Sequence, residues 1–254
     1  MKNQILRELA AVEKREKKLL ASEPINFPLK KSLYEKVPET VRIALESAFS
    51  KAFELVFLKG TSVIEKTFDK ESAGLDFEAG NFVVDKTGSR KSLKRLDKYA
   101  RKGNLLNNTA TAASGFGLGL LGLGLPDIPL MTGTLLKGLY EIALRYGFDY
   151  ESDEEKIYIL RLIRTALAHG EEKLAYNGQL DSMDIAQTTL AKEITGTAKV
   201  LSDALLVEKF LQGIPIAGAV GGIVNHMAYR KTSVLAGVKY KKRYLRGKLE
   251  EYAD

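Results

Sequence analysis

Four polar side chains are candidates for chemistry because apolar sequence surrounds or adjoins them: Asp127, Glu141, His169 and His226. Carboxylates and imidazoles are the side chains that most often act as general acids and bases. Three of them also have a structural interpretation, since Asp127 would cap the helix that follows it, His169 would cap a helix end, and His226 would be a satisfied core residue. An acid–base enzyme, such as a hydrolase, is therefore an alternative that only the fold can test.

The chain lacks the residue patterns of common metal, nucleotide and nucleophile sites. It has no cysteine, which excludes disulfides and thiolate metal ligands. Neither histidine belongs to an HExxH pattern, Ser114 has no GxSxG around it, and the glycine-rich run 115–124 lacks the GK[ST] of a phosphate loop. The acidic residues within 149–155 suit a helix N-terminus and do not have EF-hand spacing. The sequence therefore predicts no metal and no cofactor.

Two clusters of basic residues give this chain, whose net charge is +7, a means of binding polyanions. The first cluster consists of Arg90, Lys91, Lys94, Arg95, Lys98, Arg101 and Lys102, and the second of Lys241, Lys242, Arg243 and Arg246. Each basic residue near an anionic leaflet contributes about 1 kcal/mol to binding. The alternative is that both clusters are solvated faces of soluble helices. Nucleic acid is a disfavoured partner, because the sequence has no zinc spacing, no aromatic RNA-binding signature and no helix-turn-helix with a basic second helix.

Two uncharged stretches, residues 103–126 and 210–229, lie between the basic clusters. Glycines recur in them at helical spacing: Gly115, Gly119 and Gly122 in the first, Gly218 and Gly222 in the second. A glycine inside a water-exposed helix costs about 1 kcal/mol, so close packing of two helix backbones must compensate. We expect a central glycine-rich apolar helical hairpin, which would place both basic clusters at one end.

Both stretches reach the ~20 residues that a membrane-spanning helix requires. Asp127 directly follows the first stretch, while Gln212 and Asn225 lie in the second, and such groups raise the cost of insertion. The sequence therefore favours a hairpin that is buried or enters the membrane, and an integral membrane protein is the alternative. Charges recur too often near the N-terminus for the apolar core of a signal peptide, so we expect a cytoplasmic protein that is peripheral at the inner membrane face.

The elements that must position these residues are almost all helices, so the expected fold is an all-α, multi-helix bundle. Helical patterns cover residues 2–21, 38–69, 89–102, 129–146, 152–176, a segment that Asp181 or Ser182 would cap, and about 216–252. Gly147 is expected to be a left-handed cap, and Ser152 with Glu155 has capping-box spacing. Residues 72–88 hold three glycines around apolar side chains and predict a short β-hairpin. We divide the chain into an N-terminal helix with linker, 1–37, and a helical domain, 38–254.

Three segments resemble the EcsC family of bacterial proteins: LGLGLPDIPLMTG, LYEIALRYGFDYESDEEKIYIL and HMAYRKTSVLAGVKYKKRYLR. The resemblance extends over most of residues 38–250. The family is named from a gene that neighbours an ABC transporter, so the resemblance implies a link to a membrane system and supplies no catalytic residue. We therefore expect a non-enzymatic accessory or binding module at the cytoplasmic face of the membrane. Its expected partners are an anionic membrane surface or a membrane protein complex, with a lipid or another apolar ligand.

Overall fold

The structure is a computed structural model that describes residues 1–21, 37–57, 61–66, 68–100, 127–184, 186–211 and 223–252. Every regular element in these ranges is helical, which confirms the predicted all-α bundle. The helices are α1 (Lys2–Ala21), α3 (Glu39–Leu55), α4 (Thr61–Glu65), α5 (Lys70–Thr87), α6 (Arg90–Ala100), α8 (Asp127–Leu144), α9 (Asp153–Leu167), α10 (Gly170–Ser182), α11 (Leu190–Leu211) and α12 (Ile223–Glu251).

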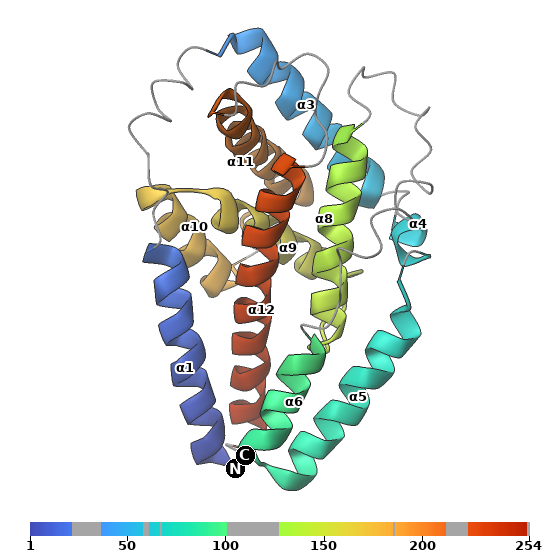
Figure 1. The fold of residues 1–254 in the computed structure, drawn as a ribbon, viewed down its shortest axis with the longest axis vertical. Helices are drawn as coiled ribbons and strands as arrows, with labels where there is room; N and C mark the ends of the chain where they lie inside the picture. The colour runs from blue at the N-terminus through green and yellow to red at the C-terminus, as the bar shows by residue number, and fades with distance from the viewer. Residues whose placement is uncertain are drawn as a thin grey trace.

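Helix α12 is the longest of these helices, with 29 residues, and it runs along the long axis of the molecule (Figure 1). It packs against α1, α8, α9 and α11. Helices α5 and α6 form a hairpin beside it, and α3 packs on α8 and α11 toward the opposite end. Both chain termini and the α5–α6 turn lie at one end of the bundle (Figure 1). Since α12 contacts so many elements, the residues that it presents to each neighbour determine how the bundle assembles.

The core contains several aromatic side chains around α8, α9 and α12. Tyr140 and Tyr150 stack with ring centroids 4.1 Å apart, and the Tyr150 hydroxyl donates a hydrogen bond of 2.6 Å to Glu65. Tyr240 of α12 lies against Phe148 and Tyr158, with centroid distances of 5.4 and 5.5 Å. Rings of this kind bury large apolar areas while their hydroxyls still find polar partners. They fix α12 at a defined rotation about its axis.

Two local predictions around the α8–α9 connection are confirmed. Gly147 has φ +81°, and the Phe148 amide donates back to the Ala143 carbonyl at 3.0 Å, as expected for a left-handed helix end. Ser152 caps α9, since its hydroxyl accepts a hydrogen bond of 3.2 Å from the Glu155 amide. The Glu155 side chain turns inward to α12, where it has a different role.

The β-hairpin predicted over residues 72–88 is wrong, because this segment forms most of helix α5. Asp69 caps α5 by accepting the Ser72 amide at 2.8 Å, and Gly88 ends it with φ +54°. Ala73 and Val84 are buried, and their spacing places them on one face of the helix. The glycines that suggested turns are tolerated here because α6 and α12 pack on this face.

Two further boundaries differ from the sequence-based expectation. The helix predicted over 152–176 is interrupted, since α9 ends at Leu167 and α10 begins at Gly170, whose φ is +53°. Asn177 and Gly178, a dipeptide typical of turns, also lie within α10. Helix α1, which we had placed in a separate N-terminal region, packs along α12 and contributes Ile5 and Val12 to the common core.

We predict that Gly147→Ala lowers the free energy of unfolding by about 1–3 kcal/mol. A side chain is strained at φ +81°, and a Cβ there would lie 2.4 Å from atoms of the Phe77 ring. Gly178→Ala is the matched control, because nothing lies within 4 Å of a Cβ at that helical position. The control should gain about 0.5–1 kcal/mol. Urea unfolding of both variants measures the difference, and equal effects would contradict the assignment of Gly147 as a strained cap.

Candidate functional site

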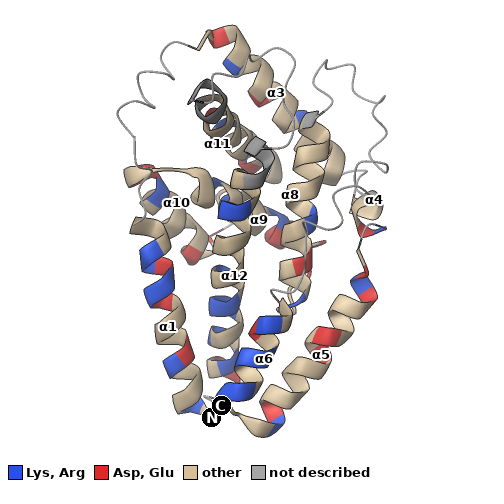
Figure 2. Cartoon of the chain, viewed as in Figure 1, with Lys and Arg blue, Asp and Glu red and all other residues tan. Residues whose placement is uncertain are grey.

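Helix α6 presents a row of basic side chains to solvent, which we call the α6 basic face: Arg90, Lys91, Lys94, Arg95 and Lys98. Their spacing of three and four residues places them on one side of the helix (Figure 2). Arg90 pairs with Glu8 at 3.1 Å but keeps 65% of its side chain exposed. Lys91, Lys94 and Lys98 make no ion pair within the described part of the chain. The α6 basic face is therefore charged and available for binding.

The opposite side of α6 holds the helix in place. Leu93, Leu96 and Ala100 are buried, and the Ser89 hydroxyl caps the helix by accepting the Ser92 amide at 3.1 Å. Asp97 accepts a hydrogen bond of 2.7 Å from the Tyr146 hydroxyl. These contacts fix the rotation of α6. As a result, Lys91, Lys94 and Lys98 are held on the outward side of α6.

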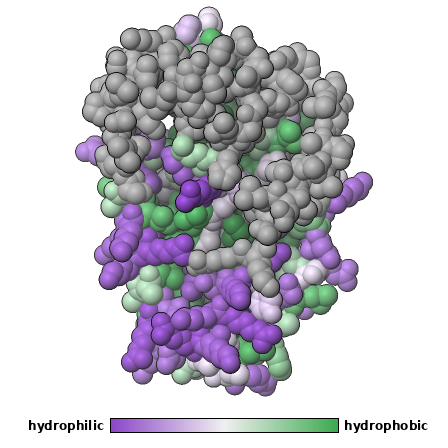
Figure 3. Space-filling view, viewed as in Figure 1, coloured by the Kyte–Doolittle hydropathy of each residue, from purple (hydrophilic) through white to green (hydrophobic). Residues whose placement is uncertain are grey.

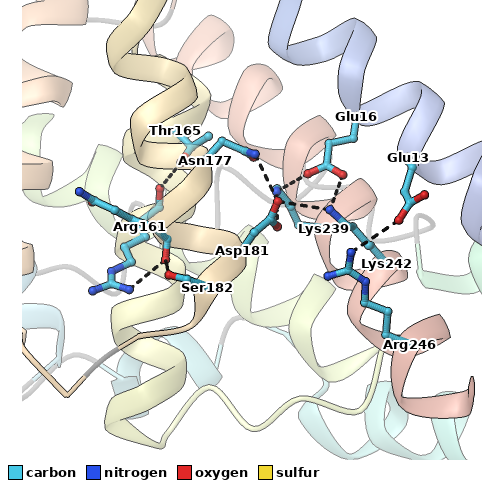
Figure 4. A network of polar contacts seen from close by, with 11 residues as sticks. Glu13, Glu16, Arg161, Thr165, Asn177, Asp181, Ser182, Lys239, Lys242 and Arg246 are labelled. Carbon is cyan, nitrogen blue, oxygen red and sulfur yellow. Dashed lines mark hydrogen bonds and ion pairs between the residues drawn. The ribbon is translucent and has the colours of Figure 1, made fainter. Parts of the chain in front are cut away.

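The second basic cluster, on α12, has a different environment, because most of it is buried. Lys241 and Lys242 have side chains 9% and 8% exposed, and Lys239 has 1%. Lys239 and Lys242 both contact Glu16 of α1 and Asp181 of α10 (Figure 4). The Lys239–Asp181 distance is 2.6 Å and the Lys242–Glu16 distance is 2.7 Å. Two ammonium groups thus meet two carboxylates, so this part of α12 presents no net charge.

Two acids that contact the α12 lysines, Asp181 and Glu8, have pKa values below their ordinary range. Burial alone would raise the pKa of Asp181, but Lys239 and Lys242 outweigh burial and lower that pKa below its ordinary value. The same balance acts at Glu8, where Lys241 at 3.1 Å and Arg90 lower the pKa. These acids therefore neutralise the α12 lysines at neutral pH.

Arg243 is enclosed by aromatic rings and a carboxylate. Its guanidinium lies 4.0 Å from the ring centroids of both Phe148 and Tyr158. It donates two hydrogen bonds to Glu155, at 2.8 and 2.9 Å, and the Tyr240 hydroxyl donates to the same carboxylate at 2.6 Å. Burial by itself would lower the pKa of Arg243, and Glu155 more than compensates and raises it. Fork geometry and ring stacking make this a fixed structural contact.

The anion-binding prediction for α12 therefore changes. Lys241, Lys242 and Arg243 already bind carboxylates inside the protein, so they no longer belong to the candidate surface. Arg246 remains partly exposed at 48% and faces Glu13 at 3.5 Å. In the first cluster, residues 101–102 lie outside the described ranges. The α6 basic face is what the structure leaves of the predicted polyanion site.

The sequence analysis assigns no role to a third charged cluster, which joins α9 to α11. Glu193 contacts both Arg161 at 3.0 Å and Arg164, and all three residues are buried. Gly196 makes room for this cluster, because a Cβ there would lie 2.6 Å from the Arg164 guanidinium. Two arginines three residues apart in an otherwise apolar helix were the available signal. Such residues are rarely buried unless they are paired.

The four candidate polar residues are spread over three helices: Asp127 and Glu141 belong to α8, His169 precedes α10 and His226 belongs to α12. Glu141 is buried in α8, where burial raises its pKa while Lys137 at 3.9 Å and Arg145 at 4.0 Å act in the opposite direction. His169 precedes α10 as its N-cap residue without a side-chain cap hydrogen bond. Asp127 begins α8 and His226 lies in the first turn of α12, and their side chains are outside the described part. The structure therefore assembles no acid–base site from the residues it describes.

The helix-packing glycines of the predicted hairpin also lie outside the described ranges: Gly115, Gly119, Gly122, Gly218 and Gly222. Within the described ranges, no helix is long and apolar enough to cross a membrane. The same residues contain no group of acids and histidines that could hold a metal ion.

The fold and this surface define a class of protein: an all-α bundle with paired internal charges and an exposed basic face on α6. The EcsC protein family matches residues 3–245, and the chain belongs to this family. It is similar to Protein EcsC of Bacillus subtilis (strain 168), with 23% identity over 76% of this chain and 74% of the relative. It is also similar to the uncharacterized protein YdbA of the same organism, with 29% identity over 49% of this chain and 48% of the relative. No solved structure matches the chain.

We predict that Glu16→Ala costs about 3–5 kcal/mol of stability, because it leaves two buried lysines with one carboxylate. Glu13→Ala is the matched control on the same helix. Glu13 and Arg246 are 42% and 48% exposed, and a surface pair of this kind contributes at most about 1 kcal/mol. Urea unfolding measures both variants, and similar losses would show that the α1–α12 network is not a buried one.

The lowered pKa of Asp181 predicts acid sensitivity. A carboxyl whose pKa is lower in the folded state stabilises the protein above its unfolded pKa, about 3.8, and this contribution is lost as the pH falls through the folded value. Asp181→Asn should therefore flatten the decline in the free energy of unfolding below about pH 4. Asp76→Asn, at an exposed position, is the control and should leave the slope unchanged. Identical pH profiles for the two variants would contradict this role of Asp181.

Proposed function

We propose that this protein is a non-enzymatic binding module that docks on the anionic cytoplasmic face of a membrane through the α6 basic face. The observation that carries the proposal is the contrast between the two basic clusters. Lys239, Lys241 and Lys242 of α12 are buried and paired with acids. Lys91, Lys94 and Lys98 are exposed and unpaired within the described part of the chain. Solvated lysines can meet lipid headgroups without breaking contacts inside the protein.

The strength of such binding follows from the number of cations. Four basic residues at about 1 kcal/mol each correspond to roughly a thousandfold enrichment at an anionic leaflet. The attraction decays within about 8–10 Å at physiological salt, so it is reversible and sensitive to ionic strength. A module of this kind suits an accessory protein that visits a membrane complex.

Membership of the EcsC family supports the general part of this proposal, that the protein works at a membrane. The family name connects to a gene beside an ABC transporter, which makes a transporter complex in the membrane a proposed partner. A lipid or other apolar ligand is part of the proposal only as a component of that membrane. The charge pattern of α6 favours a lipid headgroup phosphate as the first contact, because ammonium groups bind it as point charges.

We predict that reversing three charges, Lys91→Glu with Lys94→Glu and Lys98→Glu, lowers affinity for phosphatidylserine-containing vesicles by at least about a hundredfold. Sedimentation with vesicles at low salt measures this affinity. The wild-type protein should not pellet with vesicles of phosphatidylcholine alone, and it should dissociate as salt is added.

The matched control makes the same charge change on exposed residues of α1, with Lys14→Glu, Lys17→Glu and Lys18→Glu. Both triple variants have the same net charge, so the control separates the α6 basic face from a general effect of basicity. An equal loss in both variants, or no binding by the wild-type protein, would overturn the proposed function.

A further inference from the structure

One end of the bundle brings together parts of the chain that are far apart in sequence. The start of α1, the α5–α6 turn and the end of α12 all lie there (Figure 1). The Met1 side chain contacts the turn, since a Cβ on Gly88 would lie 2.8 Å from it. Lys248 of α12 pairs with Asp85 of α5 at 2.8 Å, and the Tyr252 hydroxyl approaches Asp85 at 3.5 Å. We call this region the terminal end.

The terminal end exposes large apolar side chains. Phe82 is 61% exposed, Leu6 45%, Val83 38% and Met1 37%. Phe82 and Val83 lie within one helical turn of Asp85, and Leu6 lies little more than one turn from Met1, so all four belong to this region. Among the described residues, other exposed large apolar side chains lie singly on α3, on α10 and toward the other ends of α5 and α12. A concentration of apolar side chains on one convex end indicates an interaction surface.

Positive charge surrounds these apolar side chains. The Lys86 ammonium lies 5.6 Å from the centroid of the Phe82 ring, and Lys2 and Lys91 are exposed at the same end. Among the acids nearby, Asp85 and Glu251 share the ammonium group of Lys248, so they reduce the positive charge of this end without removing it. Figure 3 shows hydrophobic patches among hydrophilic atoms at this end of the visible face. Apolar side chains bordered by free cations are complementary to the interface of an anionic bilayer.

We propose that the terminal end enters the interfacial layer of an anionic bilayer, with Leu6, Phe82 and Val83 reaching the acyl boundary. This proposal rests on the proposed function, and it specifies how the protein stands on the membrane. Helix α6 begins at this end, so Lys91 lies at the headgroups and Lys98 up to about 10 Å farther out. Since screening acts over a similar distance, Lys91 contributes more to binding than Lys98. The long axis of the bundle then points away from the membrane.

A tryptophan reporter tests the orientation, because the chain contains no tryptophan of its own. Phe82→Trp places the reporter at the terminal end, and Ile43→Trp places it at an exposed position on α3. The probe is a vesicle of phosphatidylserine and brominated phosphatidylcholine, in which bromine quenches indole fluorescence at the acyl boundary. Phe82→Trp should shift to shorter wavelength and be quenched on binding, and Ile43→Trp should show neither change.

A second measurement tests the apolar contribution to affinity. Leu6→Ser with Phe82→Ser should lower affinity for the same vesicles by about tenfold, as expected for partial burial of two apolar side chains. The loss should persist at raised salt, because apolar burial is not screened. Ile43→Ser with Leu174→Ser is the control, since these residues are similarly exposed elsewhere and should leave affinity unchanged. Circular dichroism confirms that both variants remain folded.

The outcomes separate this inference from the proposed function. If the wild-type protein fails to pellet with anionic vesicles, the proposed function fails and this inference falls with it. If it pellets and depends on the α6 basic face, while Phe82→Trp is not quenched and both serine variants bind equally, only this inference is overturned. A dimer in sedimentation velocity that the Leu6→Ser, Phe82→Ser variant dissociates would also overturn it, because a second copy would then cover the terminal end.

Discussion

Burial of positive charge along α12 is the constraint on which the assembly of the bundle depends. Four of its lysines are buried: Lys239, Lys241, Lys242 and Lys248. The acids that pair with them come from four other helices: Glu8 and Glu16 of α1, Asp181 of α10, Asp85 of α5 and Asp97 of α6. An unpaired charge in such a position costs several kcal/mol, so each of these helices must dock with its acid facing α12. Apolar contacts hold the bundle together, and these pairs determine which face each helix turns inward.

The pairing of internal acids with α12 also explains why basic side chains of α6 remain without acidic partners. Internal acids are used to neutralise α12, and Asp97, the acid of α6, faces Tyr146 and Lys241. The outward side of α6 therefore has only basic residues, and this is the surface that we propose for binding to a membrane. In the binding mode that we propose, exposed apolar side chains at the terminal end add an apolar contribution to membrane affinity, beside the contribution of the charges. Together they describe a protein whose buried lysines are paired with acids and whose helix α6 exposes basic side chains.

Much of the fold could be predicted from periodicity and capping residues. The helix at 2–21, the left-handed cap at Gly147 and the Ser152 cap are present as expected, because they depend on neighbours within a few residues. The β-hairpin prediction for residues 72–88 is wrong for the opposite reason, because distant contacts decide the structure of this segment. Two glycines within α5, Gly74 and Gly80, lower its helix propensity, and tertiary packing of α5 against α6 and α8 overrides that local preference. The Glu193 cluster was missed for a related reason, since its acid lies on another helix.

The sequence by itself determined an all-α bundle, its net positive charge, the positions of several caps and the resemblance to its family. Only the tertiary structure decided which basic cluster is a surface, because the two clusters have similar composition and helical spacing. The acids that neutralise α12 lie between 58 and 233 residues away along the chain. Whether a lysine contacts a carboxylate or water depends on which helices become neighbours in the folded protein. The residues next to that lysine in the sequence do not determine which helices these are.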